Sequence, residues 1–87
     1  MTIPKELVVT GTKVVVDNQG TGMNREVVLT RKPGGALDDW LHPAVGDELE
    51  ILSLPRKYEG INCVKVKYGN SEMFAYYTHI RFSTSLR

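Results

Sequence analysis

Alternation of apolar and polar residues with a period of two is the feature that most limits what this chain can fold into. The segment Asp47–Leu52 places Leu49 and Ile51 on one side and Glu48 and Glu50 on the other. A repeat of two matches an extended strand, in which successive side chains point to opposite faces, and does not match an α-helix. Since the alternation recurs along the chain, we predict an all-β domain.

Short segments rich in β-branched and aromatic residues follow one another, separated by turn residues. Further strands are expected at Leu7–Thr10, Lys13–Asp17, Arg25–Thr30, Cys63–Tyr68, Glu72–Tyr77 and Ile80–Phe82. The segment Asn18–Asn24 carries two glycines among polar residues and predicts the tip of a hairpin between the strands on either side of it. Ser53–Gly60 is expected to be a polar loop, and Gly69–Ser71 a tight turn.

The segment Arg31–Gly46 is the irregular part of the sequence. Pro33-Gly34-Gly35 interrupts any strand, and Ala36–Leu41 has the composition of a single helical turn. That turn should end by His42, because a proline at position 43 disfavours helical geometry in the residue before it.

A chain of 87 residues is expected to form one domain over 1–87, with its barrel at about 7–82 and a frayed tail at 83–87. The single cysteine, Cys63, excludes a disulfide within the chain. One cysteine and two histidines, His42 and His79, do not provide the ligands of the usual structural zinc site. We therefore expect an apolar core to hold the domain, with no metal and no cofactor.

Charge and hydropathy limit the binding partners and the cellular compartment that the sequence predicts. Eleven basic and ten acidic residues give a net charge of +1, which gives no support to general polyanion binding. The sequence shows neither a signal-peptide pattern at its N-terminus nor an apolar run long enough to cross a membrane. A lone thiol suits a reducing compartment. We expect a cytoplasmic protein that does not bind membranes.

The order of these segments resembles an SH3 domain. Gly46–Leu52 resembles the "G-D/E-x-L-x-I/V" strand that follows the RT loop of that family. A polar loop, a strand, a tight turn, a strand, a short helical turn and a terminal strand then follow in the SH3 order, and the likeness spans about Lys13–Phe82. The resemblance implies a small five-stranded SH3-like barrel with a long irregular RT-type loop and at most one short helical turn.

The residues with which SH3 domains bind proline-rich peptides are not matched. Val14–Asn18 lacks the aromatic residues of the family's first strand, and Ile61-Asn62 stands where its recognition tryptophan begins the third strand. The proline and tyrosine of its helical turn would fall near Tyr76 and His79. The resemblance therefore implies a fold and does not imply proline-peptide recognition.

The first functional hypothesis is a small non-enzymatic protein-interaction module that binds through loops on a rigid scaffold. Such a chain suits an adaptor or inhibitor of a larger complex, including one encoded by a virus such as a phage. Trp and Tyr are enriched at binding hot spots, and acidic side chains complement a basic partner. The candidate contact residues are Trp40, Asp38, Asp39, Tyr58, Met73 and Tyr77. For Trp40 the alternative is a structural lid over the end of the barrel.

The alternative hypothesis is a small barrel that binds nucleic acid through a basic sheet face. Lys65 and Lys67 share the outward side of one expected strand, and Arg56, Lys57 and Tyr58 precede them in a loop. Cations beside an aromatic ring are typical of proteins that follow a single strand by charge and base stacking. Dispersal of these residues in the fold would favour a protein partner instead.

An enzyme is the least supported class. Cys63 is expected on the outward face beside two lysines, but only His42 and His79 could serve as its base. We expect no catalytic residues. The strand alternation also predicts one shared interior formed by Leu49, Ile51, Val64, Val66, Phe74 and Ile80.

Overall fold

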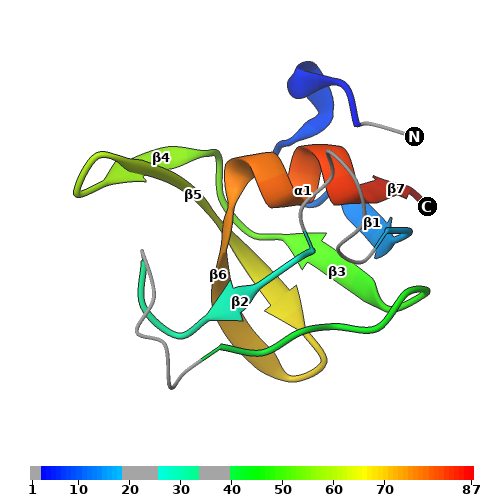
Figure 1. Cartoon of the computed structure of the whole chain (residues 1–87). Helices are drawn as coiled ribbons and strands as arrows, with labels where there is room; N and C mark the ends of the chain where they lie inside the picture. The colour runs from blue at the N-terminus through cyan, green and yellow to red at the C-terminus, as the bar shows by residue number, and fades with distance from the viewer. Residues whose placement is uncertain (1–2, 19–25, 34–39) are drawn as a thin grey trace.

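Strands make up most of the regular structure (Figure 1), so the domain that was expected to be all-β is mostly β, with one short helix. The computed structural model describes residues 3–18, 26–33 and 40–87. The elements are a 3₁₀ turn η1 (Lys5–Leu7), β1 (Lys13–Val16), β2 (Leu29–Thr30), β3 (Glu48–Ile51), β4 (Arg56–Tyr58), β5 (Ile61–Tyr68), β6 (Ser71–Tyr76), α1 (Tyr77–Ser83) and β7 (Thr84–Leu86).

The strands form one antiparallel sheet of seven, in the order β2-β6-β5-β3-β1-β7, with β4 paired to β5. Among the described residues, β2 and β7 at the two ends have one strand neighbour each, so the sheet is open. Two strands lie where none was expected. β4 lies within the segment expected to be a polar loop, and β7 lies in the segment expected to be a frayed tail.

The strands before Gly46 pair differently from the expected hairpin. β1 pairs with β3 and β7, whereas β2 pairs with β6, so β1 and β2 are not hairpin partners. The expected tip at Asn18–Asn24 lies outside the described residues except for Asn18. The expected helical turn at Ala36–Leu41 is described only at its last two residues, and there Leu41 forms an antiparallel bridge with Leu29.

The core forms on one side of the sheet, largely as expected. Five of the six predicted interior residues are fully buried, namely Leu49, Ile51, Val64, Val66 and Ile80. Phe74 is the exception, since it is only half-buried and lies outside the core cluster. Met73 and Ala75 fill the core from β6 instead, because they lie directly opposite Val66 and Val64. Residues opposite each other on paired strands share a face of the sheet.

The segment after β6 is a helix and not the expected kink and strand over Ile80–Phe82. Ile80 and Ser83 are buried and three residues apart, a spacing that brings both onto one face of a helix. Arg81 and Phe82 remain half-exposed, and the Arg81 guanidinium lies 4.9 Å from the centre of the Phe82 ring. α1 leads directly into β7, which lies against β1.

The N-terminal segment contributes to the core without forming the expected strand at Leu7–Thr10. Pro4 precedes the 3₁₀ turn η1, and its carbonyl accepts a hydrogen bond of 3.0 Å from the Leu7 N–H. Val8 and Ile3 are buried in the core cluster, and the Ile3 N–H donates to the Arg81 carbonyl at 2.8 Å. These contacts fix the segment against α1 (Figure 1).

The "G-D-x-L-x-I" segment forms a turn and then a strand. Gly46 has a φ of +96°, a conformation that a residue with a Cβ rarely adopts. The Asp47 carboxylate accepts hydrogen bonds from the Ala44 N–H at 2.9 Å and from the Tyr68 hydroxyl at 2.5 Å. β3 follows, with Leu49 and Ile51 inward as expected.

Candidate functional site

The outward side of β5 connects two hollows of different character. Ile61, Cys63, Lys65 and Lys67 alternate along this strand and share one side of the sheet. Ile61 lines one hollow, which we call the aromatic groove, and Lys67 lines the other, the charged hollow. The aromatic groove has a volume of about 570 Å³ and is lined by Val28, Trp40, Gly60, Ile61, Asn62, Tyr76, Thr78 and His79.

Four separate segments bring the lining of the aromatic groove together. β5 begins with Ile61 and Asn62, directly after the turn that joins it to β4. Tyr76 ends β6, and His79 follows in the first turn of α1. The bridge between Leu29 and Leu41 holds the segment that contains Trp40 next to β2. The groove therefore depends on contacts between residues far apart in the sequence.

Aromatic rings contribute much of the lining of the groove. The rings of Tyr76 and His79 meet edge to face, with centroids 4.8 Å apart, and His79 is only 7% exposed. Trp40 and Ile61 are 42% and 38% exposed, so two large apolar side chains face solvent at the same hollow. Trp40 also lies edge to face with His42, whose Nδ1 is 3.3 Å from a carboxylate oxygen of Glu26.

A second aromatic pair adjoins the groove on the outer face. The rings of Tyr58 and Phe74 lie edge to face at 5.5 Å. Cys63 lies between β4 and β6, opposite Arg56 and Tyr76, and is 2% exposed. Cys63 therefore has the expected outward parity, but it is buried because residues on both neighbouring strands enclose it.

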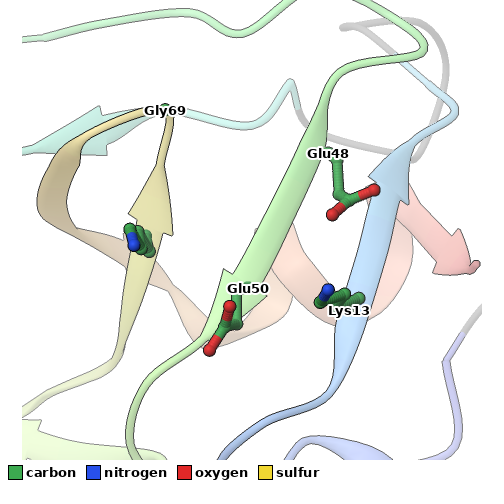
Figure 2. A pocket seen from close by; sticks show the side chains of 5 residues that line it. Lys13, Glu48, Glu50 and Gly69 are labelled. Atoms are coloured by element: carbon green, nitrogen blue, oxygen red, sulfur yellow. The ribbon is translucent and has the colours of Figure 1, made fainter.

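The charged hollow lies at the other end of the outward side, and Figure 2 shows Lys13, Glu48 and Glu50 on the strands that line it. Cross-strand pairing aligns Lys13 with Glu50, Glu50 with Lys67, and Lys67 with Glu72, so cations and carboxylates alternate across four strands. Opposite charges directly across strands stabilise a sheet, and like charges destabilise it. The hollow has a volume of about 300 Å³ and is lined by Lys13, Glu48, Glu50, Lys67 and Gly69.

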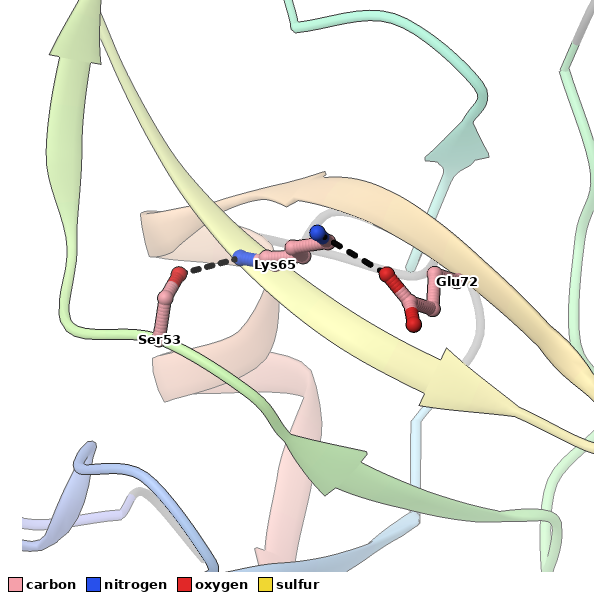
Figure 3. A network of polar contacts seen from close by, with 3 residues as sticks. All are labelled: Ser53, Lys65 and Glu72. Carbon is pink, nitrogen blue, oxygen red and sulfur yellow. Dashed lines mark hydrogen bonds and ion pairs between the residues drawn. The ribbon is translucent and has the colours of Figure 1, made fainter.

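Ion pairs and hydrogen bonds occupy most of the charged groups near this end. The Lys65 ammonium is 2.8 Å from Glu72, and the Lys65 N–H donates to the Ser53 hydroxyl at 3.2 Å (Figure 3). The hydrogen bond and charge of Glu72 raise the pKa of Lys65, and the same contacts lower the pKa of Glu72. At the edge of the hollow, Arg87 forms an ion pair with Glu48.

The predicted protein-contact residues separate into three groups. Trp40 lines the aromatic groove, and Tyr58 adjoins it on the outer face. Met73 is 5% exposed and belongs to the core, so its predicted exposure is wrong, and Tyr77 is half-buried against the same core. Asp38 and Asp39 lie outside the described residues.

The predicted nucleic-acid residues do not form one continuous basic face. Arg56 and Tyr58 have the outward parity, but Lys57 lies between them and points to the opposite side of the strand. Lys65 is paired with Glu72, and Lys67 lies between Glu50 and Glu72. Two of the four cations therefore lie opposite or beside glutamates of the sheet itself.

The sequence analysis missed most of the groove. The sequence did not single out Ile61, Asn62, Tyr76 and His79 as contact residues. The available signal was the SH3 resemblance, which grouped these four positions, and all four line the same hollow with Trp40.

Neither the described residues nor the comparisons with known proteins assign a metal site, a membrane-spanning helix or a family to this chain. In residues 3–18, 26–33 and 40–87, no group of three or more His, Cys, Asp or Glu side chains is arranged to hold a metal ion. Within the same ranges no helix is both long and apolar enough to span a bilayer. No protein-family model matches the chain, and comparisons with curated proteins and with solved structures give no match.

Proposed function

We propose that this chain is a small non-enzymatic protein-interaction module that binds its partner through the aromatic groove. The observation that carries the proposal is the exposure of Trp40 and Ile61 at one hollow that Tyr76 and His79 also line. Aromatic and aliphatic anchors gathered in one depression are typical of binding hot spots. This role suits an adaptor or inhibitor of a larger complex in the cytoplasm.

We further propose that the fold is an SH3-like arrangement. Five of the strands pair in the order β7-β1-β3-β5-β6, and α1 immediately precedes the last of them. This order and the helical turn before the terminal strand support the likeness noted in the sequence. The position of the aromatic groove adds further support, since residues near the family's peptide-binding positions line it.

Affinity purification from the native source tests the proposal. The bait is the whole chain, compared with Trp40→Ala and with Lys13→Gln as a control in the charged hollow. We expect a stoichiometric protein partner with the wild type and the control, and its loss with Trp40→Ala. Nuclease treatment before elution separates direct from bridged partners. A partner that Trp40→Ala retains would place the interface elsewhere and contradict the proposal.

Nucleic-acid binding remains the second candidate, with less support. The observation that favours it is the outward placement of Arg56 and Tyr58 beside Phe74. It predicts binding of a single-stranded oligonucleotide that weakens steeply with salt and falls when Lys65 and Lys67 are changed to Glu. Absence of binding at low salt would exclude it.

A further inference from the structure

The rim of the aromatic groove is charged unevenly. Arg56 and Lys57 on β4 are exposed, and neither side chain has an ion pair among the residues that the structure describes. Pairing with β5 brings Lys57 opposite Asn62 and Arg56 opposite Cys63, which in turn lies opposite Tyr76. Lys57 therefore lies next to Asn62 of the groove lining, whereas Arg56 lies two strands from Tyr76, with Cys63 between them.

Among the described residues, the other charged groups near the groove do not cancel these cations. Glu26 is already paired with His42 on the side of Trp40. Glu59 is exposed in the turn between β4 and β5. The segment from Arg56 to Glu59 therefore carries two cations and one carboxylate. At the charged hollow, by contrast, every lysine of the cross-strand row lies opposite a glutamate.

We propose that the groove binds an extended segment of a partner protein in which apolar or aromatic side chains adjoin one or more carboxylates. The apolar side chains lie against Trp40, Ile61 and Tyr76. The carboxylates meet the cations of β4, Arg56 on the side of Ile61 and Lys57 on the side of Asn62. Asn62 and Thr78 supply a side-chain amide and a hydroxyl that can hydrogen-bond the backbone of such a segment. This inference rests on the proposed function and adds the chemistry of the partner.

A peptide selection against the intact chain tests this polarity. The probe is a displayed library of random 12-residue peptides, and the enriched sequences are then synthesised for affinity measurements. We expect enriched peptides to place Asp or Glu within a few residues of an aromatic or aliphatic residue. Their affinity should fall about tenfold with the double variant Arg56→Glu/Lys57→Glu, since each exposed charge pair contributes modestly.

Matched variants separate the possible outcomes. Arg56→Gln/Lys57→Gln provides a milder change if the charge reversal unfolds the chain. Lys13→Gln/Lys67→Gln removes two charges at the charged hollow without placing like charges across strands and should leave affinity unchanged. Peptides lost with Trp40→Ala but unaffected by changes at Arg56 and Lys57 would overturn the inference and leave the proposed function standing. Enrichment of basic peptides would likewise overturn the inference and leave the proposed function standing. This outcome is included because the acidic residues Asp38 and Asp39 directly precede Trp40 in the sequence.

Two further results would bear on the proposed function itself or on the class of ligand. If no peptide is enriched, or if the enriched peptides bind Trp40→Ala as tightly as the wild type, the proposed function fails together with the inference. Tighter binding of a 12-nucleotide oligothymidylate than of any selected peptide, lost with Arg56→Glu/Lys57→Glu, would overturn the inference in favour of nucleic acid.

Discussion

The aromatic groove and the charged hollow lie at opposite ends of the same outward side of β5, yet their side chains behave differently. At the hollow, lysines and glutamates lie opposite one another across four strands. At the groove, large apolar side chains face solvent, and the cations of β4 have no described ion pair. A surface whose charges are matched internally gains little from a partner, whereas exposed aromatic side chains and unmatched cations gain from being covered.

The largest expected effect concerns the core that supports both ends. Ile51→Ala or Val66→Ala should lower the free energy of unfolding by roughly 1–4 kcal/mol, because each removes fully buried methyl groups. Urea or thermal melts measure this loss. A cost below that of an exposed substitution would show that the inward side of β3 and β5 has been misassigned.

A smaller effect is expected at the aromatic end. Phe74→Ala should destabilise the chain by roughly 1–2 kcal/mol, because it removes a half-buried ring and its edge-to-face contact with Tyr58. Glu72→Gln, two residues away on the same side of β6, is the matched change at the charged end and should shift the melting temperature far less. Equal effects would remove the energetic distinction between the two ends.

The contact between Asp47 and Tyr68 beside the charged hollow predicts a pH dependence. The Tyr68 hydroxyl and then the Ala44 N–H lower the pKa of Asp47, and the hydrogen bond to Asp47 raises the pKa of Tyr68. Stabilisation through Asp47 is therefore full above its ordinary pKa of about 4 and is lost as the pH falls below that value. Stabilisation through Tyr68 is full below its ordinary pKa of about 10 and is lost as the pH rises above it.

Urea melts across the pH range test this contact against Tyr68→Phe. The wild type should lose stability at both extremes, whereas the variant should lack the alkaline loss and show a weaker acidic loss. The difference between the two proteins should be constant from about pH 5 to 9. A difference that varies with pH within that interval would assign the dependence to other groups.

The smallest expected effect is that of Lys65→Ala. Lys65 contacts Glu72 at the surface, where an ion pair contributes little, so the melting temperature should not change measurably. Val66→Ala on the same strand provides the contrast. If the two variants were equally damaging, the parity of β5 would be wrong, and the comparison between the groove and the hollow would fail with it.

The sequence by itself determined the strands whose two sides differ chemically. In β3 the alternation of Glu48, Leu49, Glu50 and Ile51 leaves one possible inward side. The turn before β6 was equally clear, because Gly69 occupies the first position of a two-residue hairpin turn with a φ of +60°, which favours glycine.

Only the tertiary structure decided which side of β6 faces the core. Met73 and Ala75 alternate with Phe74 and Tyr76, so both sides are apolar or aromatic, and the pattern groups them without choosing between them. Pairing with β5 made the choice by placing the smaller set opposite buried valines. Phe74 and Tyr76 were thereby left on the outer face.

Tertiary contacts also decided the conformation of the C-terminal segment and the assembly of the groove. Ile80–Phe82 is too short for a period of two to be told from a helical spacing, and burial of Ile80 and Ser83 on one face selected the helix. The groove joins Trp40, Ile61, Tyr76 and His79 from segments far apart in the chain. A pattern along one strand carries no information on which distant residues it will meet, because that depends on the pairing order of the whole sheet.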